Sequence, residues 1–310
     1  MSRIFVILNA NSGNGNDEAL SRRVHDLFAA ADMPAEVALA RGAQEISAKI
    51  AHAIAMNSDV IVAGGGDGTV SLVAAALVDR EIALGVLPLG TLNHFAKDLR
   101  LPMNLDAAVQ QIVAGVRLKV DVGEVNGRIF VNNSSLGLYP DIVRDRELQQ
   151  RRLGRSKWLA FFWAAVAALR RYPFLSVGLI VQGSEHRRRT PFVFIGNNEY
   201  RMQGFALGGR ECLSAGRLSL YTAQHPGRLR LVQFALRALA GRLKQARDFD
   251  LMVTTELVVE SRKQHLRVAT DGEVTVLRPP LRYRIRPASL TVLAAGAQPA
   301  AAPVPSVPSD

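Results

Sequence analysis

The sequence predicts two domains: an α/β domain followed by a mainly β domain with an antiparallel sandwich. Apolar strand-like runs alternate with helix-like segments up to about residue 122, and short strand-like runs dominate afterwards. Alternation favours a mostly parallel sheet covered by helices on both faces, whereas successive short strands favour a sandwich or open barrel. The predicted domains are residues 1–122 and 123–295. Residues 296–310, rich in Ala, Pro and Ser, are expected to be a disordered tail.

In the first domain, short apolar runs mark the strands and 3.6-residue spacing marks the helices. The predicted strands are residues 4–8, 35–39, 60–63 and 83–87, and the predicted helices are 17–30, 44–56, 70–78, 91–99 and 105–114. Loops rich in Gly, Asn, Ser or Thr follow three of the strands, at residues 9–15, 64–69 and 88–93. Parallel sheets bind ligands beyond the carboxyl ends of their strands. We therefore expect these loops to converge on one site.

In the second domain, the predicted strands are short and closely spaced. They are residues 120–125, 128–131, 176–181, 192–195, 217–222, 257–259, 266–270, 281–285 and 290–293, with helices at 157–169 and 229–240. The apolar run at 158–169 is too short for the ~20 residues that span a bilayer. It predicts a buried helix or, alternatively, one that dips into a membrane surface.

Composition limits the compartment and the partners. The single cysteine, Cys212, rules out an internal disulfide and suits a reducing compartment, and the first apolar run is too short for a signal peptide. The net charge of +11 comes largely from residues 144–157, 186–189 and 228–247. Aromatic residues are only 6% and do not interleave with basic ones, which favours an anionic membrane over nucleic acid as the partner. A generally solvated basic surface is the alternative.

The segment from Asp59 to Ser71 carries the strongest chemical signal. An apolar strand runs into three glycines, then Asp67, Gly68 and Thr69, and a helix follows. Glycines let backbone N–H groups approach an anion, and the helix points its positive end at the same place. A carboxylate beside a phosphate implies a cation between them or a proton to be moved. The segment therefore predicts a site that binds a nucleotide and a metal ion and that carries out a reaction.

The other loops are ambiguous when taken singly. Residues 9–15 contain neither a phosphate-binding lysine loop nor a full dinucleotide fingerprint. Thr91 suits either phosphate binding or a helix cap. Asp271-Gly272 is the pair expected in a tight hairpin turn. Asp121 and Asp141 resemble ordinary turn or cap acids, and the histidines form no ligand cluster.

Together, these segments resemble the diacylglycerol kinase catalytic-domain family, which includes bacterial YegS-like lipid kinases and sphingosine kinases. The matching residues are 9–13, 65–69, 88–93, 130–137, 152–154, 197–204 and 271–273, in the family's order and across most of residues 3–295. The glycine segment is also shared with NAD kinases and, loosely, with phosphofructokinases. The resemblance implies a Rossmann-like first domain similar to those families, with ATP in the cleft between the two domains.

The resemblance also implies site residues. Glu273 matches the proton acceptor, Asp67 the acid tied to ATP-bound Mg2+, directly or through water, Asp121 a residue that completes the catalytic site, and Asp141 a substrate-side acid. The expected nucleotide-binding residues are Asn9, Ser12, Gly13, Gly65, Gly66, Asp67, Gly68, Thr69, Ser71, Thr91 and Asn93. Phosphoryl transfer needs such positioning, charge neutralisation and a base near the attacking hydroxyl, which we expect to be Glu273 or Asp121.

The chain departs from the family pattern at five places. The substituted positions are Ala40, Leu72, Leu92, His94 and Ala215. The first four weaken expected contacts near the nucleotide. The last replaces an acid that supports a structural magnesium in relatives, so we expect that second metal site to be absent.

The sequence therefore predicts an ATP- and magnesium-dependent lipid kinase acting on a diacylglycerol-like or sphingoid-like lipid. We expect it in the cytoplasm, peripheral at the inner membrane face, with a lipid partner on an anionic surface and no nucleic acid; a homodimer is left open. Two alternatives stand beside it: a kinase of a soluble acceptor in the manner of NAD kinase, and a non-catalytic lipid- or nucleotide-binding regulator derived from a kinase.

Overall fold

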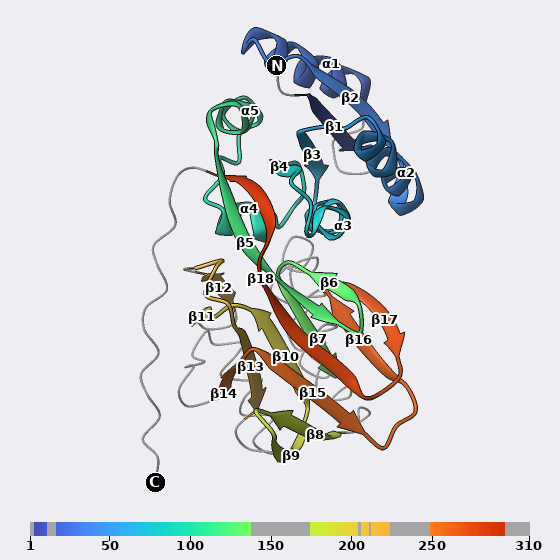
Figure 1. Ribbon diagram of the computed structural model, residues 1–310, viewed down its shortest axis with the longest axis vertical. Coiled ribbons are helices and arrows are strands. Elements are labelled where there is room, and N and C mark those ends of the chain that lie inside the picture. The colour runs from blue at the N-terminus through green and yellow to red at the C-terminus, as the bar shows by residue number, and fades with distance from the viewer. Residues whose placement is uncertain are drawn as a thin grey trace, which may run out of the picture.

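The computed structural model describes residues 3–10, 17–137, 174–203, 206–210, 212–223 and 249–294. Several predictions fall outside these residues: Ser12, Gly13, Asp141, the helices expected at 157–169 and 229–240, and the tail from 296. Figure 1 shows an α/β domain at the top and a β-rich domain at the bottom, linked by the long strands β5 (Val116–Val125) and β18 (Leu281–Ala294). The predicted fold class is confirmed.

The first domain is built on four parallel strands. They lie in the order β2-β1-β3-β4. The strands are β1 (Ile4–Asn9), β2 (Ala35–Ala40), β3 (Val60–Gly65) and β4 (Ala83–Pro88), and the helices are α1 (Asp17–Ala30), α2 (Gly42–Ala55), α3 (Asp67–Leu77), α4 (His94–Asp98) and α5 (Leu105–Ala114).

Alternating side chains of this sheet enter two separate cores. On β1, Phe5 and Ile7 pack with residues of α2 and α3, while Val6 and Leu8 pack with residues of α1 and α5. All four side chains are buried, because helices cover both faces of the sheet. This arrangement is the predicted three-layer α/β structure.

The strands β5 and β18 belong to both domains. The last residues of β18 return to the first sheet, where Val292 pairs parallel with Leu84 of β4. A register shift between Arg286 and Leu290 interrupts the pairing of β18 with β5, and Ala288 within it has a positive φ of 49°. The predicted boundary at residues 122–123 therefore falls inside β5, at the place where the sheet passes between domains.

The second domain is an antiparallel sandwich. One layer continues the first sheet through β18-β15-β8-β9, and the other has the order β14-β13-β10-β7-β16-β17. Its strands are β6 (Arg128–Phe130), β7 (Asn133–Gly137), β8 (Leu175–Val181), β9 (Ser184–Thr190), β10 (Phe192–Asn197), β11 (Tyr200–Gln203), β12 (Ala206–Arg210), β13 (Leu218–Ala223), β14 (Phe249–Thr254), β15 (Glu256–Ser261), β16 (Leu266–Thr270) and β17 (Glu273–Leu277). Leu179 and Val259 from one layer and Ile195 and Val268 from the other share a buried core.

Three sequence-based expectations about elements were wrong in detail. Helix α3 begins at Asp67 and not at residue 70, so the Asp-Gly-Thr segment forms its first turn. The two strands expected at 281–285 and 290–293 are one long strand, β18. Strands β7, β9, β11, β12, β14 and β17 were not predicted. Strand β9 reads Ser-Glu-His-Arg-Arg-Arg-Thr and carries little apolar signal because it lies at a sheet edge.

Candidate active site

The described starts of the three polar loops lie at the carboxyl edge of the parallel strands, as expected; of the first loop, only residues 9 and 10 are described. Asn9 ends β1 and donates from its side-chain amide to Thr69 Oγ1 at 2.9 Å. Leu89, just after β4, donates its backbone N–H to Gly65 O at the end of β3, at 3.1 Å. Adjacent parallel strands place these loop starts side by side. The site therefore has backbone and side-chain groups from β1, β3 and β4 at one edge.

Two glycines allow the loops after β3 and β4 to touch. A Cβ on Gly90 would lie 2.3 Å from Gly66 Cα, so any side chain there would force the backbones apart. A Cβ on Gly65 would lie 2.5 Å from Thr69 Oγ1. These positions need glycine because of close approach, whereas a Cβ on Gly68 would meet nothing within 4 Å. Open space beside Gly68 in the first helical turn leaves room for a ligand.

Helix α3 begins at this edge. Its N-cap is Gly66, which has no side chain to satisfy the N–H groups of the first turn. Unsatisfied N–H groups and the helix dipole together favour an anion such as phosphate. The positions of Gly65, Gly66, Gly68 and Thr69 fit the nucleotide role predicted for them, which stays a prediction.

Asp67 is the acid of this loop and lies in the first turn of α3, partly exposed. Its Oδ1 receives the backbone N–H of Phe95, on α4, at a long 3.4 Å. Among the described residues, no hydrogen bond reaches its Oδ2. A carboxylate oxygen left open beside a helix N-terminus suits a cation that also touches phosphate, since oxygen ligands are those that magnesium prefers. The residues present therefore fit a magnesium ion carried with ATP.

Asn93 shapes the loop that follows β4. It has a left-handed backbone, with φ of 51° and ψ of 47°, and is buried. Its Oδ1 receives Gly90 N at 3.0 Å, and its Nδ2 donates to Gly90 O at 2.8 Å and to Pro88 O at 3.2 Å. The side-chain amide of Asn93 is thus occupied by its own loop. This favours an indirect role for Asn93 in the predicted nucleotide binding, through the shape of that loop. Thr91 is exposed, and the N-cap of α4 is Asn93, not Thr91.

The Asp271-Gly272 pair forms the tight hairpin turn between β16 and β17. Both residues have positive φ, 47° and 88°, and they connect the paired Thr270 and Glu273. Glu273, at the start of β17, is exposed. The described residues provide no hydrogen bond to its carboxylate, which leaves it able to accept a proton. Its catalytic role stays a prediction.

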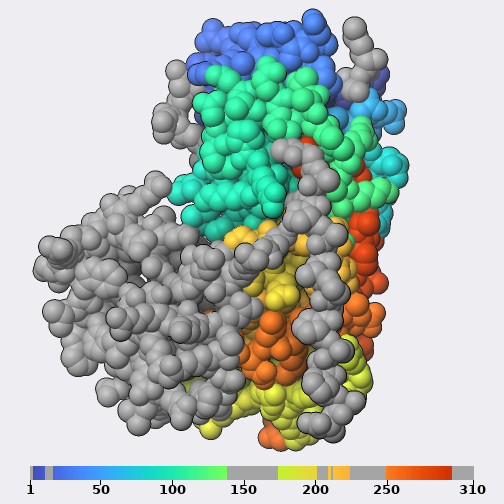
Figure 2. Space-filling model, turned by 90° about the vertical axis from the view of Figure 1, so that its left-hand side faces the viewer, coloured from blue at the N-terminus to red at the C-terminus, as the bar shows by residue number. Residues whose placement is uncertain are grey.

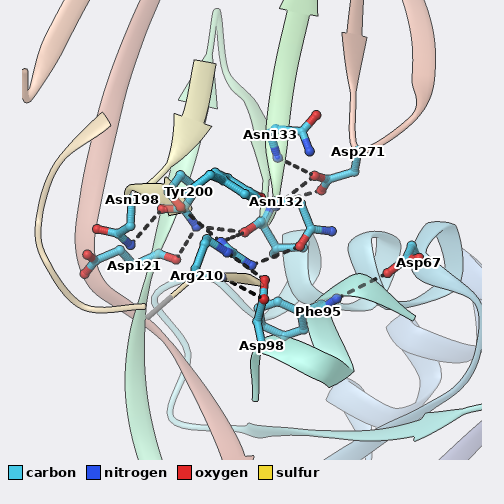
Figure 3. A network of polar contacts seen from close by, with 12 residues as sticks. Asp67, Phe95, Asp98, Asp121, Asn132, Asn133, Asn198, Tyr200, Arg210 and Asp271 are labelled. Carbon is cyan, nitrogen blue, oxygen red and sulfur yellow. Dashed lines mark hydrogen bonds and ion pairs between the residues drawn. The ribbon is translucent and has the colours of Figure 1, made fainter. Parts of the chain in front are cut away.

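Asp271 was expected as a turn residue, but the part its carboxylate plays in joining the two domains was missed in the sequence; Figure 3 shows its contacts with residues Asn132 and Asn133. Its carboxylate receives the backbone N–H groups of Val131, Asn132 and Asn133 at 2.8, 2.8 and 3.1 Å. It also receives the Ser71 hydroxyl, on α3 and 200 residues away, at 2.8 Å. Burial raises the pKa of Asp271, and these hydrogen bonds act in the opposite direction. The hairpin that carries Glu273 is therefore fastened to the helix that carries Asp67.

Asp121 is buried where β5 passes between the domains, with 2% exposure. Its Oδ2 receives Gly216 N at 2.6 Å and its Oδ1 receives Ala288 N at 2.9 Å. A buried carboxylate with both oxygens held by backbone N–H groups is poorly placed to take a proton from a lipid hydroxyl. The structure thus favours a bracing role over the predicted direct catalytic one, and Glu273 is the better candidate for the base.

The departures from the family pattern have identifiable surroundings. Ala40 ends β2, and its carbonyl receives Ala10 N at 3.0 Å. Leu72 packs against the first core, and His94 begins α4. Ala215 N donates to Asn198 Oδ1 at 3.1 Å, beside the Gly216–Asp121 hydrogen bond. Hydrogen bonds from backbone N–H groups to side chains hold this loop. The expected absence of a second magnesium site stays a prediction.

Two kinds of feature are absent from the described segments of the chain. No group of three or more His, Cys, Asp or Glu side chains could hold a metal ion there by itself. No helix within those segments is long and apolar enough to cross a membrane.

Comparison with known proteins agrees with this arrangement. Residues 3–125 match the family described as diacylglycerol kinase catalytic domain, and residues 141–294 match the YegS C-terminal NAD kinase β-sandwich-like domain. A probable lipid kinase YegS-like protein of Klebsiella pneumoniae is 41% identical over 91 residues, which are 28% of this chain and 31% of that protein. A diacylglycerol kinase of Staphylococcus saprophyticus is 29% identical over 140 residues, which are 44% of this chain and 45% of that protein.

Solved structures show the same fold over nearly the whole chain. The crystal structure of a putative diacylglycerol kinase from Bacillus anthracis superposes with a TM-score of 0.73, at 20% sequence identity and with 96% of each chain covered. The aligned segments of the two curated relatives are less than half of their length. Sequence similarity to these two relatives thus covers less than half of this chain, whereas similarity of fold extends across both domains.

Proposed function

We propose that the protein is an ATP- and magnesium-dependent lipid kinase, because residues 3–125 match the diacylglycerol kinase catalytic domain and residues 141–294 match the YegS C-terminal domain. It would transfer the γ-phosphoryl group to a hydroxyl of a diacylglycerol-like or sphingoid-like lipid. One observation carries the proposal: the Ser71–Asp271 hydrogen bond of 2.8 Å holds the hairpin bearing Glu273 against the helix bearing Asp67. An anion site and a free carboxylate are thereby brought to one place from distant parts of the chain.

In this proposal, the glycine loop and α3 bind the nucleotide. N–H groups at the start of α3 would hold phosphate oxygens, and the contact between Gly66 and Gly90 keeps the loop open to them. Asp67 would hold the magnesium. When bound, ATP supplies the phosphoryl group and magnesium neutralises charge on it.

Glu273 supplies the proton acceptor. Among the acids Asp121, Asp271 and Glu273, the first two have carboxylates engaged by backbone N–H groups, and that of Glu273 is exposed. A correctly placed general base contributes roughly 10²–10⁴-fold to a rate. We therefore assign the proton of the attacking lipid hydroxyl to Glu273.

The acceptor is proposed to be presented from an anionic membrane surface at the cytoplasmic side. The net charge of +11 favours this, at ~1 kcal/mol for each basic residue near such a surface. Among the described residues, His186, Arg187, Arg188 and Arg189 follow one another on the edge strand β9. We also propose that Asp141 is an acid on the substrate side of the site, as the family resemblance implies.

The test is transfer of label from [γ-32P]ATP to lipid. The purified protein is incubated with magnesium and anionic vesicles containing diacylglycerol or a sphingoid base, and a known lipid kinase serves as positive control. Labelled lipid is expected with the wild type and is expected to be lost with Asp67→Asn and Glu273→Gln. Matched controls are Asp106→Asn and Glu256→Gln, whose side chains are exposed away from these loops. Label only in added NAD or sugars would favour the soluble-acceptor kinase, and no label at all would favour the non-catalytic regulator.

A further inference from the structure

A buried ion pair joins the two domains beside the candidate site. Asp98 lies on α4 of the first domain and Arg210 ends β12 of the second, and their side chains are 5% and 0% exposed. Arg210 Nε donates to Asp98 Oδ2 at 2.8 Å, and Arg210 N donates to Asp98 Oδ1 at 3.1 Å. Figure 2 shows residues of this part of the first domain, in teal, lying directly against the yellow residues of the second.

Removing two charges from water is costly, so a buried pair is weak evidence for stability. The other contacts of Arg210 indicate that this ion pair has a role other than stabilisation. Its Nη1 donates to Val131 O at 2.6 Å and Asn197 O at 3.1 Å, and its Nη2 donates to Asn132 Oδ1 at 3.0 Å. Its guanidinium also lies 5.4 Å from the centroid of the Tyr200 ring. The planar fork of arginine can fix several partners at once, which a lysine cannot.

These contacts lead to helix α3 by two routes, which Figure 3 shows as far as Asp271 on one side and Asp67 on the other. On one side, Val131 and Asn132 donate their N–H groups to Asp271, which receives the Ser71 hydroxyl. On the other side, Asp98 shares α4 with Phe95, whose N–H points to Asp67. Asp67 and Ser71 are four residues apart and therefore lie on one face of α3. Arg210 thus stands between the two contacts that hold this face.

We propose that Asp98 and Arg210 are a positioning pair: they set the placement of Asp67 relative to the hairpin that carries Glu273. The inference rests on the proposed function. Both side chains are too deeply buried to touch a substrate, so they act through α4 and through residues 131–132. Placement matters in this reaction because a displacement of 1 Å at a reacting group can cost about 10²-fold in rate.

The first test separates positioning from stability. The double variant Asp98→Leu/Arg210→Met removes both charges at similar volume, which in other proteins leaves stability unchanged or raised. We expect an unfolding midpoint close to that of the wild type, a KM for ATP within about threefold, and a kcat lower by roughly 10- to 100-fold. A double variant with wild-type kcat would show that the pair only supports the fold, and would overturn the proposal.

A second variant covers the case in which the double variant does not fold. Arg210→Lys keeps the charge next to Asp98 and loses the fork to Val131 and Asn132. A lower kcat at unchanged KM for ATP is expected, and kcat equal to that of the wild type would again overturn the proposal. Arg286→Met, which removes an arginine from the half-exposed cluster around Glu124, is the control.

Amide hydrogen exchange tests the pair without any activity. The N–H groups of Val131, Asn132 and Asn133 are expected to exchange at least tenfold faster in Arg210→Lys than in the wild type or in Arg286→Met. If the wild type labels no lipid, the proposed function fails, and the exchange result alone decides the inference. Unchanged protection at these amides would show that Arg210 does not hold them.

Discussion

Two sets of ion pairs connect the parts of this molecule near the domain boundary, and they differ in burial. The buried connection is Asp98 with Arg210, whose side chains are 5% and 0% exposed. In the exposed connection, Arg286 contacts Asp79, just after α3, and reaches Glu124 at 3.2 Å, while Arg284 reaches the same carboxylate at 2.9 Å. The Arg284 and Asp79 side chains are 56% and 57% exposed, whereas those of Arg286 and Glu124 are 29% and 11% exposed. This second set is therefore more exposed than the Asp98–Arg210 pair, although Glu124 itself is buried.

The difference in burial indicates which of the two connections can control the placement of α3 relative to the second domain. Exposed pairs are screened by water and salt and contribute little, because long side chains adapt without loss. A buried pair has no such freedom, since each unsatisfied charge or N–H group would be penalised. We therefore expect the relation between α3 and the second domain to depend on the buried connection and to tolerate changes in the exposed one.

The largest effect is expected from Arg210→Met. It removes the arginine that pairs with the buried Asp98, which should lower the free energy of unfolding by about 3–5 kcal/mol. Urea denaturation followed by circular dichroism measures this. A loss below about 1 kcal/mol would contradict the distinction between the two connections.

The next effect is expected from Asp271→Asn, which keeps the shape of the side chain. The amide that replaces one oxygen cannot accept from Val131 N and Ser71, so about 2–3 kcal/mol should be lost. Ser71→Ala removes only one of the four hydrogen bonds and should cost about 1 kcal/mol by the same measurement. Equal losses in the two variants would mean that the backbone N–H groups do not depend on the carboxylate.

The uncharged contact between Gly66 and Gly90 can be tested in the same way, with Gly68 as the comparison. Gly90→Ala places a Cβ 2.3 Å from Gly66 Cα and should cost about 2 kcal/mol through overpacking, with weaker ATP binding. Gly68→Ala, whose Cβ meets nothing within 4 Å, is the stability control. Thermal unfolding and ATP titration of both variants check this. Similar melting temperatures would show that the loops after β3 and β4 do not need their close contact.

The smallest effect is expected from Arg286→Met, the same substitution made in the exposed connection. Glu124 keeps Arg284, and Asp79 remains hydrated, so the free energy of unfolding should fall by less than about 1 kcal/mol. The loss should shrink further at 1 M salt. A loss as large as that of Arg210→Met would remove the contrast on which the account depends.

The sequence was informative where local rules decide the structure. Alternating apolar runs and helical spacing predicted the three-layer first domain, and Asp271-Gly272 predicted a hairpin that the structure confirms. The glycine cluster also predicted that loops after three strands would meet. Those features depend on residues close in sequence, or on the rule that parallel strands end at one edge.

Contacts between distant residues could not be predicted. Asp98 on α4 and Arg210 on β12 are charged residues of a kind that usually lies on the surface, and their sequence separation of 112 hides the pair. The polar strand β7 has the sequence Asn-Ser-Ser-Leu-Gly, which carries no alternating pattern. Asp271 was recognised as a turn residue, but the destination of its carboxylate depends on how the domains pack.

The most direct measurement for the proposed chemistry is the magnesium dependence of lipid phosphorylation in Asp67→Asn. If Asp67 holds the metal, the variant should need roughly 10- to 100-fold more magnesium for half-maximal rate at fixed ATP, with a lower maximal rate. Asp106→Asn should behave like the wild type. A magnesium requirement and a maximal rate in Asp67→Asn equal to those of the wild type would contradict the account.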